Sequence, residues 1–240
     1  MSDLALPLGQ LSEDFVQERS GEGCVQENGL FCVDWAVDNF DRYMDPLLQH
    51  LVLVSVSVGL GFAIAFSLAL LSHRHSWLQP PLVVGTGILY TLPSLAFFFL
   101  LLPVTGRGAD TAIIALTAYT LQIIFRNTVT GLNNVPASVK DSGRGMGLTD
   151  RQLLWRVELP LAVPEIIAGL RIATVSTVAI ATLAVFAGGG GLGEPIYQQL
   201  KFTTNVVIGG GLAILIAIIF DALLFWIQRI TTPWRRAVPS

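Results

Sequence analysis

Residues 51–72 read LVLVSVSVGLGFAIAFSLALLS, an apolar run that contains no charged side chain. A helix rises about 1.5 Å per residue, so about 20 such residues cross a hydrocarbon core about 30 Å thick. The run is therefore long enough to span a membrane as one helix. The whole chain fits this reading: 13% of its residues are charged, whereas soluble proteins carry about 25%.

Four more apolar runs follow, at or within residues 76–106, 111–125, 172–188 and 206–227. The second is interrupted by prolines, at Pro80, Pro81, Pro93 and Pro103. The third is short, and it spans only if Asp110 and Arg126 mark its two interfaces with side chains that reach water. We therefore predict an all-α integral membrane protein with five transmembrane helices.

Charge decides the predicted orientation. With an odd number of spans the termini lie on opposite sides, and an outside N-terminus would put ten of the 14 basic residues on the cytoplasmic side. The outside would keep Arg19, Arg42, Arg107 and Lys201. Because basic loop residues favour the cytoplasm, we predict that the N-terminus is outside and that residues 233–240 form a cytoplasmic tail.

The first 46 residues form an acidic head that precedes the membrane domain, residues 47–232. Ten acidic and two basic residues give this head a net charge of −8. It lacks a signal peptide of its own, so we expect it to be exported with the first span and to remain uncleaved. Cys24 and Cys32 both lie in it. An oxidising compartment permits a disulfide between them, and two free thiols are the alternative reading.

Several kinds of chemistry lack their residues in this chain. A phosphate-binding P-loop requires Gly-Lys-Ser or Gly-Lys-Thr, and neither Lys140 nor Lys201 has these neighbours. No His-Glu-x-x-His motif, Cys/His cluster or Gly-x-Ser-x-Gly motif is present. The net charge of −3 argues against a nucleic-acid partner. We expect no catalysis, no metal, no cofactor and no nucleic acid, and ATP-driven work would require a partner subunit.

The connection between the third and fourth runs, residues 126–165, is long for a compact membrane protein and is therefore a candidate functional loop. We predict one short helix after Pro136 that ends at glycines 145 and 147. A second helix should be capped by Thr149 and ended by Pro160. Two short helices across a glycine turn would thus project into the cytoplasm.

The loop resembles the membrane-spanning subunits of binding-protein-dependent ABC importers. Their hallmark is Glu-Ala-Ala, three residues, Gly, nine residues, then Ile-x-Leu-Pro. Here the same spacing relates Asp141-Ser142-Gly143, Gly147 and Val157-Glu158-Leu159-Pro160. The resemblance implies a type I importer permease fold and a coupling helix that docks on an ATPase subunit. Asp141, Gly147, Leu159 and Pro160 are the matching positions; Gly143 departs from Ala and should loosen its helix by up to about 1 kcal/mol.

Further segments are similar to the osmoprotectant branch of that superfamily, which imports glycine betaine, proline betaine, choline or carnitine. These segments are residues 126–132, 145–149, 157–164, 168–174 and 188–193, and the likeness covers about residues 47–236. The resemblance implies a permease of the cell's inner or plasma membrane. Its implied partners are an ATPase dimer, a second permease copy or relative, a solute-binding protein and membrane lipid.

Two other features are candidate sites. Gly188, Gly189, Gly190, Gly191 and Gly193 follow the fourth run and would act either as a gating hinge or as a flexible reversal. Asp221 is an acid inside a span, which requires a partner or water. We favour an ion pair or interface anchor there over a proton relay.

Two alternatives to the osmoprotectant reading stay open. The nearer one is an importer of the same superfamily for methionine or another amino acid. The further one is a channel or a membrane-embedded enzyme, which would work without an ATPase and would not need the spaced glycine and Leu-Pro of the loop.

Overall fold

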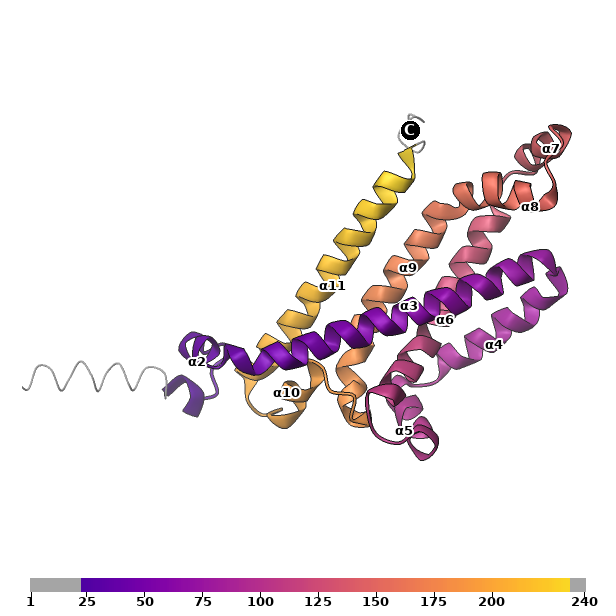
Figure 1. Ribbon diagram of the computed structural model, residues 1–240. Helices are drawn as coiled ribbons and strands as arrows, with labels where there is room; N and C mark the ends of the chain where they lie inside the picture. Colours follow the sequence, from indigo (N-terminus) through magenta and orange to yellow (C-terminus); the bar gives the residue numbers. More distant parts are fainter. Residues whose placement is uncertain (1–22, 234–240) are drawn as a thin grey trace, which may run out of the picture.

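The computed structural model describes residues 23–233 (Figure 1). Residues 1–22 of the acidic head and residues 234–240 of the predicted tail lie outside the described residues. The helices are α2 (Val33–Asp38), α3 (Met44–Arg74), α4 (Gln79–Thr91), α5 (Ser94–Thr105), α6 (Ala109–Asn133), α7 (Ala137–Gly145), α8 (Asp150–Leu153), α9 (Leu159–Ala181), α10 (Gly193–Gln198) and α11 (Thr203–Thr231). Short 3-10 turns lie at Phe40–Tyr43, Ser76–Leu78 and Thr182–Ala187, and a π-helical turn lies at Leu154–Glu158.

The prediction of an all-helical membrane protein is confirmed, with one refinement in the number of spans. Within the described residues, four helical stretches are long and apolar enough to cross a membrane. They contain α3, α6, α9 and α11. Helices α4 and α5 pass the same test only as a pair, bent by 98°, and together they would make a fifth crossing.

The bend between α4 and α5 follows from one of the four prolines in the second run. Pro93 disfavours a helical conformation for the residue before it, and Leu92 is extended with ψ of 132°. The hydroxyl of Tyr119 on α6 donates to the Leu92 carbonyl at 2.5 Å, which satisfies an acceptor that the broken helix leaves open. Pro80 and Pro81 fall in the first turn of α4, where proline is tolerated.

Helix α6 is the centre of the bundle. Its most extensive contacts are with α3 on one side and α9 on the other, and α11 packs mainly on α9. Glycines allow these helices to approach closely: Gly61 of α3 lies against Thr120, and Gly169 of α9 lies against Asn127. Apolar side chains gain nothing by leaving lipid for another helix, so small residues that permit close packing hold such bundles together.

The bundle has two distinct ends. Figure 1 shows α2, α5 and α10 at one end and α7 and α8 at the other. The turn between α3 and α4 and the C-terminal end of α11 lie toward the α7–α8 end. The loop predicted to be cytoplasmic and the described part of the acidic head, residues 23–46, therefore lie at opposite ends of the bundle.

Two helix boundaries differ from the sequence prediction. Helix α6 continues past Arg126 to Asn133, and α9 begins at Leu159 instead of near residue 172. The connection between them is therefore residues 134–158, shorter than the predicted loop 126–165. The sequence prediction located the spans as charge-free apolar runs, so it ended them at charged residues such as Arg126 and Arg171. The helical extensions carry polar residues and pack against each other, as at Gly131 and Ala162.

The prediction that Pro160 ends the second loop helix is wrong. Helix α8 passes through the π-helical turn directly into α9, and Pro160 lies in the first turn of α9. Proline lacks an N–H and its ring clashes with the carbonyl four residues earlier, which here belongs to Arg156. The wider π turn accommodates this defect without ending the helix.

The described part of the acidic head is folded onto the start of α11. A disulfide joins Cys24 and Cys32. Asn28 receives a hydrogen bond from the Thr203 backbone N–H at 2.8 Å, and the Cys32 N–H donates to the Thr204 hydroxyl at 3.0 Å. The disulfide loop thus supplies partners at the N-terminus of the last span.

We predict that Gly61→Ala destabilises the bundle by about 1–3 kcal/mol, the usual cost of overpacking. A Cβ at residue 61 would approach the Thr120 Cβ to 2.8 Å, whereas a Cβ at Gly59 on the same helix meets nothing within 4 Å. The measurement is the free energy of unfolding of the purified protein in detergent. Gly59→Ala is the matched control, and equal stability of the two variants would contradict this account of α3–α6 packing.

Candidate functional site

The loop between α6 and α9 is a compact helical hairpin. Helix α7 ends at a turn where Gly147 has φ of +82°, a conformation that glycine adopts without strain. Two backbone hydrogen bonds close the turn, from Gly147 N–H to Arg144 O at 2.9 Å and from Leu148 N–H to Gly143 O at 3.2 Å. The predicted glycine break is therefore present, and Gly147 is the residue that requires glycine.

Thr149 caps α8, as predicted. The Gln152 N–H donates to the Thr149 hydroxyl at 3.4 Å, and the Thr149 N–H donates to Gln152 Oε1 at 2.9 Å. This reciprocal capping box satisfies two donors that a helix start leaves open. The second helix is thereby fixed directly after the glycine turn.

Gly143 has a role that its helix propensity does not suggest. It is buried, and a Cβ built on it would approach Cδ1 of Leu153 to 2.6 Å. Leu153 is itself 2% exposed. The missing side chain therefore lets α7 lie against α8, and the expectation that Gly143 only loosens its helix leaves out this contact.

The residues that match the importer hallmark divide into two groups. Asp141 and Ser142 are exposed on α7. Asp141 forms an ion pair with Arg144, with 3.5 Å between Asp141 Oδ1 and Arg144 Nη1. Val157, Leu159 and Pro160 belong instead to the junction with α9, and Leu159 is buried in a cluster with Leu132, Ala162 and Ile166. The first group can meet a partner, and the second anchors the hairpin to the spans.

Exposed apolar side chains give the hairpin a contact surface. Met146 at its tip is 74% exposed, and Trp155 in the π turn is 54% exposed. Aromatic and methionine side chains are enriched in the cores of protein interfaces. This arrangement suits docking on another protein.

Sequence reasoning missed Glu158, the buried acid of the loop. Its Oε2 lies 2.5 Å from His73 Nε2 at the end of α3, and its Oε1 lies 3.7 Å from Lys140 Nζ on α7. His73 is far from Glu158 along the chain, and Lys140 lies on the other side of the glycine turn. No short sequence motif therefore indicates that these three side chains meet.

The glycine-rich segment after the fourth run is a tightly packed turn. Gly188, Gly190 and Gly191 have positive φ, and Gly189 lies so close to α6 that a Cβ would approach that of Ala112 to 2.6 Å. Gly193 packs against the Thr182 backbone. The close packing of this glycine-rich segment favours a fixed turn over a flexible reversal. A gating role for these glycines stays a prediction.

Polar groups of α3 hold this turn. The Gly191 N–H donates to Gln49 Oε1 at 3.2 Å, and the Leu192 N–H donates to His50 Nδ1 at 3.4 Å. A cavity of about 620 Å³ lies beside it, with Gln49, Gly190 and Glu194 among its lining residues. The turn thus borders an opening at the end of the bundle opposite the loop.

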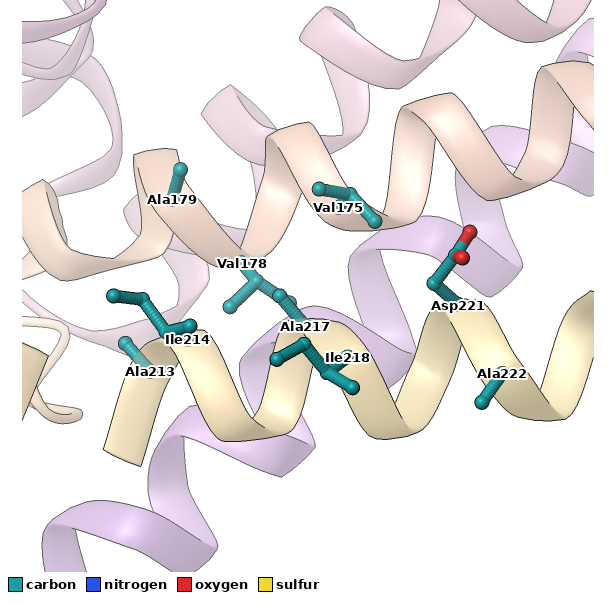
Figure 2. Close-up of a pocket in the computed structure, with 9 residues that line it drawn as sticks. All are labelled: Val175, Val178, Ala179, Ala213, Ile214, Ala217, Ile218, Asp221 and Ala222. Atoms are coloured by element: carbon teal, nitrogen blue, oxygen red, sulfur yellow. The ribbon is translucent and has the colours of Figure 1, made fainter. Parts of the chain in front are cut away.

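Asp221 forms a bidentate ion pair with Arg171. Both carboxylate oxygens lie 2.8 Å from guanidinium nitrogens. Arg171 Nη1 also donates a hydrogen bond to Gln228 Oε1 at 3.4 Å. Figure 2 shows the Asp221 side chain directed from α11 toward α9, at the edge of an apolar pocket that small and branched side chains line. The geometry fits the ion-pair interpretation, and the partner comes from the neighbouring span.

Comparison with known proteins identifies the class. Residues 57–237 match the family described as "Binding-protein-dependent transport system inner membrane component". The chain belongs to this family of importer permeases, and it is a multi-pass protein of the inner (plasma) membrane.

Relatives within this family carry related names. The chain is 36% identical to the osmoprotectant import permease protein OsmW of Salmonella typhimurium over 84% of this chain and 97% of that protein. It is 32% identical to the carnitine transport permease protein OpuCD of Listeria monocytogenes over 84% of this chain and 92% of that one. The chain is 42% identical to the glycine betaine/carnitine/choline transport system permease protein OpuCB of Bacillus subtilis, over 63% of this chain and 71% of that protein.

Solved structures support the fold. An inward-facing structure of the MetNI methionine ABC transporter matches with a TM-score of 0.67 and 22% identity, covering 82% of this chain and 96% of that one. The crystal structure of an amino acid ABC transporter with histidines matches with a TM-score of 0.68 and 17% identity, covering 80% of this chain and 95% of that one. These likenesses establish the type I importer permease fold and carry no information on the solute.

We predict that Gly143→Ala loosens the hairpin although alanine is the better helix former. The added methyl group must displace the buried Leu153 side chain. The measurement is the initial rate of trypsin cleavage at Lys140 and Arg144, which should rise about fivefold for a local cost of about 1 kcal/mol. Gly145→Ala, with no neighbour within 4 Å, is the control, and the same rate in both variants would refute the close-packing role.

We predict that Asp221→Asn destabilises the folded protein by up to about 3 kcal/mol because it leaves Arg171 without its counter-charge inside the bundle. The double variant Arg171→Gln/Asp221→Asn should recover much of this loss, since it leaves no unpaired charge. Unfolding free energies in detergent give the comparison. A double variant that is worse than the sum of the two singles would argue against the pair.

Proposed function

We propose that this chain is the transmembrane permease of an ATP-driven importer of osmoprotectants such as glycine betaine, carnitine or choline. The observation that carries the proposal is the similarity to OsmW over 84% of this chain and 97% of that protein. The similarity includes the segments around the hairpin and the glycine-rich turn. The permease forms the pathway for the solute and performs no chemistry.

Three partners follow from this function. An ATPase dimer hydrolyses ATP and docks on the hairpin through the exposed face of α7 and Met146. A second permease copy, or a related permease, completes the pathway. A solute-binding protein delivers the solute at the end of the bundle that carries α2 and α10.

The mechanism is a switch between two arrangements of the spans. ATP binding would draw the two ATPase subunits together and displace the hairpins docked on them. The spans then change from inward-facing to outward-facing and receive solute from the binding protein. ATP biases a bistable assembly in this scheme, which is how such transitions are driven.

The first test is uptake of labelled glycine betaine at high osmolarity by cells with the gene, without it, and with Gly147→Asp. A side chain at φ of +82° strains the turn between α7 and α8, so we expect the variant to lose most uptake while the protein is still present in the membrane. Gly145→Ala, at a neighbouring exposed glycine with ordinary φ, should transport normally.

Competition between solutes distinguishes the osmoprotectant proposal from its nearest alternative, an importer of methionine or another amino acid. Excess choline or carnitine should reduce glycine betaine uptake, and excess methionine should not. Equal uptake of labelled glycine betaine, choline and carnitine with and without the gene would refute the osmoprotectant proposal, and gene-dependent methionine uptake would favour the amino-acid importer. Uptake that persists without an ATPase subunit would point to a channel.

We also propose the orientation that charge predicts, with α2 outside and the hairpin in the cytoplasm. The described residues contain no free cysteine, so single cysteines introduced at Val37 (70% exposed) and Met146 (74% exposed) can be labelled selectively. A membrane-impermeant maleimide should modify Val37→Cys on cells whose inner membrane is intact, and Met146→Cys only after that membrane is opened. The reverse pattern would overturn the orientation.

A further inference from the structure

The buried carboxylate of Glu158 lies where the hairpin joins the spans. The residue is 5% exposed, and it lies in the π-helical turn between α8 and α9. Removing a carboxylate from water is costly unless charged or hydrogen-bonding partners compensate. Its two partners are therefore required for it to lie there.

These partners come from different parts of the fold. His73 belongs to the last turn of α3, the first span, and Lys140 belongs to α7 of the hairpin. Lys140 Nζ also lies 3.4 Å from the Leu132 carbonyl near the end of α6. One carboxylate thus links the hairpin, the first span and the start of α9, and its lysine partner reaches the central span.

The local backbone suits a moving joint. A π turn has one residue more per hydrogen-bonded loop than an α-helix, and such turns occur often at functional sites. A hollow of about 740 Å³ adjoins it, with His73, Arg74 and Glu158 among its lining residues. The joint therefore has space beside it in which side chains can rearrange.

We propose that Glu158 is a positioning residue that transmits movement of the docked hairpin to α3 and α9 together. This inference rests on the proposed ATP-driven import and names the residues of this chain that carry its coupling. The hydrogen bond between Glu158 and His73 is short and fixed in geometry, and the ion pair with Lys140 at 3.7 Å adds attraction across the junction, whereas apolar contacts can slide. The link of Glu158 to His73 and Lys140 makes the first span follow the hairpin instead of slipping past it.

The test uses the whole transporter, reconstituted in vesicles with its ATPase and binding protein and with glycine betaine as the probe. ATP hydrolysed and solute accumulated are measured in the same vesicles for the unaltered chain, Glu158→Gln, Lys140→Met and the double variant. His75→Gln is the matched control, since His75 is an exposed histidine two residues from His73. A merely structural residue would change the amount of assembled transporter and leave the ratio of solute to ATP unaltered.

We expect Glu158→Gln to lower the solute carried per ATP by about fivefold or more, the scale of a typical coupling between two sites. ATP hydrolysis should continue, and the double variant should be no worse than the worse single variant, because both act through one link. His75→Gln should keep the unaltered ratio. An unchanged ratio in Glu158→Gln would overturn the inference.

A second measurement keeps this result separate from the choice of solute. Spin labels at the exposed positions Leu71 on α3 and Trp226 on α11, in complexes diluted with unlabelled chain, should change their separation when ATP and vanadate are added. The change should be lost in Glu158→Gln and kept in His75→Gln. If the unaltered chain shows this change but takes up neither glycine betaine nor choline nor carnitine, the osmoprotectant proposal fails. If Glu158→Gln keeps the change, the transmission role fails.

Discussion

The hydrocarbon core offers no water to polar groups, and this constraint shapes the bundle. Several hydroxyls in the spans bond to a carbonyl of their own helix, as Thr128 and Thr177 do, whereas other polar groups have a partner on another helix. The broken helix before Pro93 leaves the Leu92 carbonyl open, and Tyr119 of α6 donates to it. The carboxylate of Asp221 on α11 meets the guanidinium of Arg171 on α9. The same bonds that satisfy these groups fix how the helices are arranged.

Close packing is the second consequence of the membrane environment. The hydrophobic effect does not drive apolar helices together in lipid, so contact depends on surfaces that fit. Gly61 and Gly169 bring α3 and α9 against α6, and Gly143 does the same for the two helices of the hairpin. Central helix α6 therefore touches both of its neighbours closely, and a displacement of one element is transmitted to the next.

The hairpin and the spans are joined by a continuous helix instead of a flexible linker. Helix α8 continues through the π turn into α9, and the buried Glu158 ties this junction to α3 and α7. At the opposite end, the disulfide loop of the head supplies hydrogen bonds to the start of α11. Both ends of the bundle are thus held by contacts between elements far apart in the sequence.

The sequence by itself determined the membrane class, the positions of the apolar runs, the glycine turn at Gly147 and the cap at Thr149, because composition, run length and capping are local properties. It also carried the family resemblance through the spacing from Asp141 to Pro160. Only the tertiary structure decided the sharp bend between α4 and α5, the true start of α9, and the partners of Glu158 and Asp221. Those features depend on contacts between distant residues: a proline can bend, end or begin a helix, and a buried charge can pair with any neighbour, until packing selects one.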